Sequence, residues 1–292
     1  MIDHRFRDAA ALVAGGYTPI PIIPGTKRPN LDEWPTYQFK EGDAAKYADH
    51  GIGIVTRHTP AIDIDVYDAD AAAEIEKMML GILEGEVPPE RIGLAPKRLF
   101  LFRTDKPFRK KLTAKHVLPG CDPKTKLSRV EILGDGQQFV AYGVHPETKQ
   151  PYVWNGSGNP FSVSAADLPL LTEPMADEII VRSEIILKRH SKLGELRSAL
   201  KVLPADDYAA WIRYGMACHA TGYGAEAFTI WDEWSRTSGK YKISETAEKW
   251  KTFSSDGPRT VTAKSIYAVA KSAGWVTQKQ TEFRDRGCPA GC

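Results

Sequence analysis

The sequence of 292 residues predicts an α+β protein in which a mixed-sheet domain is followed by an all-helical bundle domain. Two observations predict this order. Segments with the period-two alternation of strands end near Trp154, and from Ala166 onward helical periodicity takes over. The length also favours two domains over one. We expect domain one at 1–160, a linker and connecting helix at 161–192, the helical domain at 193–276 and a tail at 277–292.

Apolar side chains with period-two spacing, bounded by Gly and Pro, place the strands of the first domain. The edge strand Tyr17–Ile23 contains two prolines, which a central strand would not tolerate. Residues 137–142 are expected to return after a Gly-Asp-Gly turn as the hairpin partner of 128–133. The full expectation is a helix at 3–14, strands at 17–23, 51–56 and 61–66, a helix at 69–83, then strands at 98–103, 128–133, 137–142 and 151–154.

The remaining segments are expected to be a long basic loop at 104–127 and a flexible Gly/Ser/Asn break at 155–160. Helices are predicted beyond them at 177–190, 193–203, 206–220, 225–235, 244–253 and 263–273. Several tryptophans recur along this half, and we interpret them as its core, with base stacking by an exposed one as the alternative.

Composition is that of a globular protein, with 42% hydrophobic and 26% charged residues. No apolar run approaches the length needed to span a membrane, and the N-terminus lacks the apolar core of a signal peptide. The four cysteines form no C-x-x-C pair. These features favour a cytoplasmic protein that has no membrane partner.

The stretch Ala61–Val66 carries the first candidate site. Successive side chains of a strand point to opposite faces, so Asp63 and Asp65 emerge together while the apolar residues pack on the other side. Neighbouring carboxylates repel each other, and a divalent cation between them removes that cost. Hard oxygen ligands suit Mg²⁺ or Mn²⁺. An edge strand whose solvent face happens to carry two aspartates remains an equal alternative on this stretch alone.

Further charged residues at predicted strand ends extend this site. Glu131 is a third acid, and paired acids with a third on a facing strand can hold the two metal ions of nucleotidyl transfer. Cations can neutralise a triphosphate, guanidinium groups in bidentate fashion. The candidates are Lys97, Arg98, Arg129, His145 and Lys27, the last on a rigid Pro-Gly turn. For His145 a structural role stays equally open.

Positive charge is concentrated in one segment. Arg91 to Arg129 contain 12 Lys/Arg and two Asp, a local charge of +10, so the remainder carries 2 − 10 = −8. Such a segment is the footprint expected for a polyanion partner, with a solvated surface loop as the alternative. The candidate nucleic-acid contacts are Arg103, Arg109, Lys110, Lys111 and Lys115.

Several motifs occur in a fixed order: GYTPIPIIPGTKRPNLDEW, GIGIVT, AIDIDV, RLFLFR and VEILGDGQQFVAYGVHPETKQPYVW. Over about residues 10–155 the chain thereby resembles the bifunctional primase-polymerase branch of the archaeo-eukaryotic primase superfamily, of the phage and plasmid type. The run LPADDYAAWIRYGMACHATG, with WDEWSRTSGKY and KWKTF, is similar to a helical primase C-terminal module between about 193 and 275.

This resemblance implies that the family's paired acids fall on Asp63 and Asp65, its third acid on Glu131, and its His-Pro hairpin end on His145. The chain departs from the family at the strand after the paired acids, where a histidine usually contacts the nucleotide. Pro96-Lys97-Arg98-Leu99 stands there instead, so Lys97 or Arg98 is expected to hold the phosphate.

The resulting expectation is a primase-polymerase that uses a single-stranded DNA template, nucleoside triphosphates and Mg²⁺ or Mn²⁺, in the host cytoplasm if phage-encoded. A metal-dependent nuclease and a non-catalytic replication-origin binder are the alternatives. A replicative helicase is a further candidate partner, since no G-x-x-x-x-G-K-[ST] motif marks a motor in this sequence.

Overall fold

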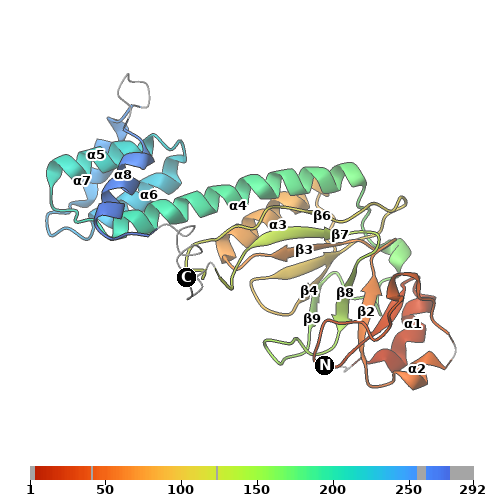
Figure 1. Ribbon diagram of the computed structural model, residues 1–292. Coiled ribbons are helices and arrows are strands. Elements are labelled where there is room, and N and C mark those ends of the chain that lie inside the picture. Colours follow the sequence, from red (N-terminus) through yellow and green to blue (C-terminus); the bar gives the residue numbers. More distant parts are fainter. Residues whose placement is uncertain (1–3, 41, 123, 255–260, 277–292) are drawn as a thin grey trace, which may run out of the picture. The chain divides into compact units, whose positions relative to one another are not determined.

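The computed structural model describes residues 4–40, 42–122, 124–254 and 261–276 (Figure 1). The chain divides into two compact units, Met1–His116 with Leu127–Leu187 and Val117–Lys126 with Lys188–Cys292. The first unit holds the strands and the second is helical, which confirms the predicted α+β architecture. The predicted tail at 277–292 lies outside the described residues.

The described part of the first unit contains two sheets. One has six strands in the order β6-β7-β3-β5-β4-β9, and the other has three in the order β1-β2-β8. Neighbouring strands in both sheets pair antiparallel. The strands are β1 (Pro19–Ile22), β2 (Gly51–Val55), β3 (Ala61–Asp65), β4 (Pro89–Ile92), β5 (Arg98–Leu101), β6 (Lys111–Leu112), β7 (Arg129–Leu133), β8 (Gln138–Tyr142) and β9 (Val153–Gly156).

Strand β3 lies inside the larger sheet, between β5 and β7. Its buried Ile62 and Ile64 lie on the face covered by α3 (Ala69–Ile82). Asp68 caps that helix by accepting a hydrogen bond from the backbone N–H of Ala71 at 2.8 Å. The opposite face begins with Ala61, which packs in the core shared with the three-stranded sheet. Asp63 and Asp65 therefore lie on this second face, where the three-stranded sheet ends and solvent begins.

The remaining elements of the first unit are short. They are η1 (Phe6–Asp8), α1 (Ala9–Ala14), η2 (Trp34–Thr36), α2 (Asp43–Lys46) and η3 (Ala165–Asp167). Phe6 and Leu12, from η1 and α1, are fully buried in the core with Ile52, Ile54 and Phe139 of the three-stranded sheet.

The predicted hairpin of 128–133 with 137–142 is wrong. Strand β7 pairs with β3 and β6, so both its edges are occupied, and β8 pairs with β2 in the other sheet. The Gly134 turn carries the chain between the sheets, and a Cβ on Gly134 would clash with the backbone oxygen of Phe108. Local sequence indicates a turn but not which strand receives the next segment.

Three further expectations are corrected by pairing. Strand β4 was not predicted, and it joins β5 to β9. The supposed flexible break begins inside β9, where Asn155 and Gly156 pair with Glu90 and Pro89. The supposed loop at 104–127 contains β6, paired with β7. Weak strand formers are ordered here because a partner strand offers its hydrogen bonds, which composition cannot reveal.

The predicted helices at 177–190 and 193–203 are one helix, α4 (Glu173–Lys201). No proline interrupts its interior. A Cβ atom at position 194 would lie 2.8 Å from Cγ of Pro119, and Gly194 avoids this clash. The later helices are α5 (Tyr208–His219), α6 (Gly224–Ser235), α7 (Ile243–Lys251) and α8 (Ala263–Ser272). Trp231, Trp234 and Trp275 are buried in their common core, as predicted. Among the described residues, no helix combines the length and apolarity that crossing a membrane requires.

Candidate active site

The three predicted acids come together through strand register. Asp63 of β3 is the direct partner of Glu131 of β7, and Asp65 is the partner of Arg129. Directly opposed residues of an antiparallel pair project from the same face with their Cβ atoms about 5 Å apart. Asp63, Asp65 and Glu131 therefore form one carboxylate cluster on the face that carries the second sheet.

Burial distinguishes this cluster from the solvent-facing strand that the sequence suggested. Glu131 is only 8% exposed, and both aspartates are partly buried. Burial raises the pKa of Asp63 to about 6; Arg91 opposes this shift, and the neighbouring Asp65 adds to it. Desolvation and like charge both penalise the carboxylate form, so an added cation would be stabilising here.

Cations of the chain itself face two of the acids. Nζ of Lys97 lies 2.8 Å from Oδ1 of Asp65. Oε1 of Glu131 lies 3.0 Å from Nζ of Lys110 and 2.5 Å from a guanidinium nitrogen of Arg129. Lys110 was predicted to contact nucleic acid; its ammonium group lies beside Glu131, and the nucleic-acid contact stays a prediction.

A polar cavity of about 230 Å³ opens beside Asp63 and Asp65. Its walls come from the turn after β1, from β3, β4 and β5 with the residues next to them, and from the segment between β8 and β9. The lining residues are Lys27, Asp63, Asp65, Tyr67, Arg91, Gly93, Leu94, Lys97, Arg98, His145, Glu147 and Tyr152. Acids at one wall and cations at the others make it suited to a polyanion bound through a metal ion.

Arg91 is the site residue that sequence reasoning missed. It partners Leu99, which in turn partners Asp63, so both charged side chains share a face. Its guanidinium donates to the backbone oxygen of Val140 and lies 4.4 Å from the ring centroid of Tyr152. Burial lowers the pKa of Arg91, while the Asp63 carboxylate opposes that shift. Its Nε, like the hydroxyl of Tyr152, is buried without a hydrogen-bond partner in the described structure.

His145 lies in the cavity wall in a defined tautomer. Its Nδ1 accepts the backbone N–H groups of Glu147 and Thr148, at 3.2 and 3.3 Å. A ring nitrogen that accepts cannot carry a proton, so the proton of the neutral ring is on Nε2. Burial lowers the pKa of His145, and the nearby Lys27 lowers it further. The ring is therefore a neutral hydrogen-bond donor near pH 7.

Gly93 and Arg98 affect the shape and the charge of the cavity wall near His145. A Cβ on Gly93 would collide with the ring of Tyr152 and lie 2.8 Å from Cδ2 of His145, so only glycine leaves room for both rings. Arg98 also lines the cavity, but its guanidinium pairs with Glu76 of α3 and lies 3.5 Å from Glu90. Its charge is thus already matched, and Lys97 is the better placed of the two for a ligand.

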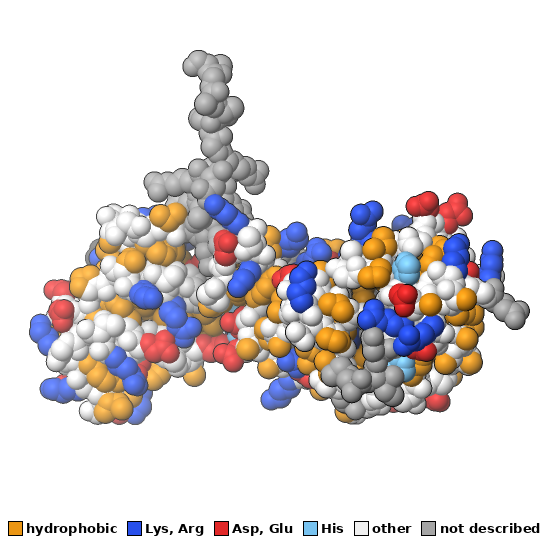
Figure 2. Space-filling model, turned by 90° about the horizontal axis from the view of Figure 1, so that it is seen from below, with side chains coloured by type: hydrophobic (Ala, Val, Ile, Leu, Met, Phe, Trp, Pro, Cys, Tyr) orange, Lys and Arg blue, Asp and Glu red, His pale blue; other side chains and the backbone are white. Residues whose placement is uncertain are grey.

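The predicted nucleic-acid contacts separate into different environments. Lys111 pairs with Glu173 and Asp177 of α4, at 3.0 and 2.7 Å, and Arg103 pairs with Asp105 at 2.9 Å. Arg109 and Lys115 are exposed, and neither forms an ion pair with another described residue. On the face seen in Figure 2, acidic side chains lie between the Lys and Arg side chains. Part of the local charge of +10 is thus matched by acids outside the segment, while Arg109 and Lys115 stay exposed.

Arg109→Glu and Lys115→Glu are expected to weaken binding of a single-stranded oligonucleotide and to flatten its salt dependence. Each lost phosphate contact lowers the slope of log affinity against log salt by about 0.7. Fluorescence anisotropy between roughly 50 and 200 mM salt measures this slope. Lys77→Glu, an equal charge reversal on the exposed side of α3, is the matched control. An unchanged slope in both variants would make the segment ordinary surface.

A divalent cation fits the donor chemistry of the acids but needs a rearrangement. Three hard carboxylates share one face, and Asp63 is destabilised as an anion by its surroundings. Within the described residues, no group of three His, Cys, Asp or Glu side chains is arranged to hold a metal ion. The ion pairs of Lys97, Lys110 and Arg129 turn the carboxylates toward the chain's own cations.

Comparison with known proteins agrees with this architecture. A family model described as bifunctional DNA primase/polymerase, N-terminal, matches residues 9–170, more than half of the chain. A model described as primase C terminal 2 matches residues 196–270. The chain belongs to the bifunctional DNA primase/polymerase family, whose members generally depend on divalent metal ions and use DNA and nucleotides as substrates.

A curated relative, "Putative helicase 121R" of Invertebrate iridescent virus 3, is 33% identical over 78 residues. The matched segment is 26% of this chain and 8% of that protein. The chain thus spans a small part of the length of the viral protein.

Proposed function

We propose that this chain is a DNA-dependent primase-polymerase that makes and extends primers from nucleoside triphosphates by two-metal nucleotidyl transfer in phage or plasmid replication. The observation that carries the proposal is that Asp63, the strand partner of Glu131, lines a cavity together with several cations. A Mg²⁺ or Mn²⁺ pair held by Asp63, Asp65 and Glu131 would activate the attacking hydroxyl and neutralise the phosphates.

The chain's own residues have separate roles in this proposal. Lys97, Lys27 and Arg91 supply positive charge for the triphosphate along one side of the cavity. His145, neutral with its proton on Nε2, donates a hydrogen bond without adding charge. The buried hydroxyl of Tyr152 supplies another donor. Arg129 and Lys110 hold Glu131 in place.

A nuclease built on the same acids would need a positioned water but no triphosphate cradle, so the cation-lined wall favours the polymerase. An origin binder would need neither a positioned water nor a triphosphate cradle. Incorporation of labelled nucleotide on single-stranded DNA without a primer separates the three. The proposal predicts labelled product, a nuclease would shorten the template, and an origin binder would give a gel shift alone.

Lys97→Ala, Arg91→Ala and His145→Ala are expected to raise the apparent Michaelis constant for nucleotide about 10-fold or more each, since a charge-assisted hydrogen bond contributes about 1.5–3 kcal/mol. Template affinity should change little. Steady-state extension at varied nucleotide concentration, with template binding measured by anisotropy, gives both numbers. Arg98→Ala serves as comparison, because its guanidinium is held by Glu76 and Glu90. If the three variants lower only template affinity, the cavity holds nucleic acid.

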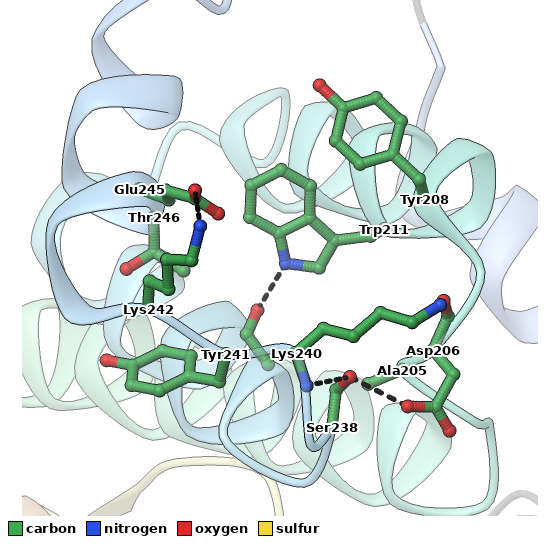
Figure 3. A pocket seen from close by; sticks show the side chains of 11 residues that line it. Ala205, Asp206, Tyr208, Trp211, Ser238, Lys240, Tyr241, Lys242, Glu245 and Thr246 are labelled. Atoms are coloured by element: carbon green, nitrogen blue, oxygen red, sulfur yellow. Dashed lines mark hydrogen bonds and ion pairs between the residues drawn. The ribbon is translucent and has the colours of Figure 1, made fainter.

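Primer initiation adds a requirement that extension lacks, since the first nucleotide has no duplex to hold it and must be bound by protein. We propose that residues 193–275 of the helical unit meet it. A pocket of about 80 Å³ there places Trp211 and Tyr208 near Lys240 and Lys242 (Figure 3). The indole of Trp211 donates to Oγ of Ser235 at 2.8 Å. The ammonium groups contact the chain itself, that of Lys240 the backbone oxygen of Asp206 at 2.9 Å and that of Lys242 the carboxylate of Glu245 at 3.0 Å. Aromatic rings beside ammonium groups that can turn to phosphates suit a nucleotide.

The replicative helicase remains a proposed partner. The name of the viral relative is that of a helicase, and the chain covers 8% of that protein. A motor encoded on a separate chain or on a longer polypeptide would supply the unwound template that the proposed activity requires.

A further inference from the structure

Lys97 occupies the place where the proposed mechanism needs a metal ion. Its Nζ lies 2.8 Å from Oδ1 of Asp65 and 3.5 Å from the centroid of the Tyr67 ring. The side chain is 18% exposed, so the ammonium is held mostly by protein. The ion pair therefore places an ammonium group directly at Asp65.

An ammonium and a divalent ion at the same carboxylate oxygen disfavour each other. Mg²⁺ binds carboxylate oxygen at about 2 Å. With Nζ of Lys97 2.8 Å from Oδ1 of Asp65, the two cations would lie roughly 4 Å apart and would repel each other. Coordination by Asp65 through this oxygen therefore favours a Lys97 side chain that has turned away.

The displaced ammonium needs a new anionic partner. Besides Asp63 and Asp65, the acidic side chain that lines the cavity is Glu147, which is exposed to solvent. Lys27, Arg91 and His145 line the other walls and offer no negative charge. A triphosphate in the cavity would supply the missing partner, at a site that Lys97 reaches from β5.

We propose that Lys97 is an internal counter-ion of Asp65 that the metal displaces and the triphosphate receives, so that metal and nucleotide bind with positive coupling. The proposal rests on the function proposed above. In the free protein Asp65 is neutralised by Lys97 at 2.8 Å. Linkage requires each ligand to raise the affinity of the other by the same factor.

Mn²⁺ binding to the full chain tests this without turnover, by the electron paramagnetic resonance signal of free Mn²⁺. Titrations are done alone and with a non-hydrolysable nucleoside triphosphate analogue, correcting for Mn²⁺ bound by the analogue itself. The wild type should bind Mn²⁺ weakly alone and about 10-fold or more tightly with the analogue, within the usual range of coupling. Lys97→Met should bind Mn²⁺ more tightly alone and lose most of the enhancement.

Two variants make the outcome specific. Lys27→Met removes a positive charge from the same cavity and leaves the ion pair of Lys97 with Asp65 in place. If Lys27→Met raises Mn²⁺ affinity as much as Lys97→Met does, the gain comes from general electrostatics, and the proposal is overturned. Unchanged or weaker Mn²⁺ binding by a folded Lys97→Met, or by Lys97→Gln if that variant folds better, would also overturn it. Asp63→Asn tests the proposed function separately from the counter-ion proposal. If this change leaves Mn²⁺ affinity unaltered, the proposed function itself is refuted.

Discussion

Asp63→Asn is expected to abolish nucleotide incorporation and, at pH 7, to raise the free energy of unfolding. The carboxylate is a proposed metal ligand, and losing several kcal/mol of transition-state stabilisation lowers the rate by about 10³-fold or more. The same carboxylate is costly in the free protein, because burial raises its pKa from 3.8 to about 6. Asparagine has nearly the same shape and carries no charge, so it removes the cost together with the function.

The sign of the pH dependence follows from linkage. A folded-state pKa above the unfolded value means that the folded protein binds the proton more tightly. The contribution of Asp63 to stability is therefore lost as the pH rises from 3.8 to about 6, and above that range the charged group costs roughly 1–3 kcal/mol. Asp63→Asn should lack this decline. Denaturant unfolding at several pH values between 4 and 8 measures it.

Asp65→Ala and Glu131→Ala should also abolish incorporation, but they are expected to lower stability. Each leaves buried or partly buried cations without their partner, Lys97 in the first case and Lys110 with Arg129 in the second. Asp70→Asn, on an exposed position of α3, is the charge-matched control for Asp63. Near-normal incorporation by Asp63→Asn would refute the two-metal proposal.

Tyr208→Ala and Lys242→Ala are expected to reduce primer initiation about 10-fold or more while primer extension stays within about twofold. Stacking of one base on an aromatic side chain contributes about 1–3 kcal/mol, and the first nucleotide has no other partner to replace it. Tyr208 is 69% exposed and both positions line the pocket of Figure 3, so these changes should leave the fold intact. Initiation and extension are compared on the same template.

Lys251→Ala removes an exposed lysine of α7 that pairs with Glu248, away from the pocket lining, and is the matched control. A truncation supports the comparison, and it belongs after Leu187 rather than after Pro160. Leu168, Leu171 and Ile179 are buried, and the first unit extends to Leu187. Equal loss of both activities, or of neither, in the pocket variants would assign the helical unit another role.

Local sequence was sufficient to predict much of the fold and part of the candidate site. Alternation in Ala61–Val66 placed both aspartates on one face. Helical periodicity separated the second unit, and Trp231 and Trp234 are core residues as expected. These features depend on side-chain period and composition, which each segment carries in itself.

What the sequence alone determined is therefore most of the strands and helices, without β4, β6 and the continuity of α4, together with the acidic strand β3 and the family. Tertiary structure decided which strands are neighbours. Through that pairing it assigned Lys110 to Glu131, Lys111 to the acids of α4, and the unforeseen Arg91 to the cavity. A shift of one residue in register turns every side chain to the other face, and register is set by partners far away in the chain. The sequence therefore showed that cations are present in these segments, but it did not show where in the structure each of them lies.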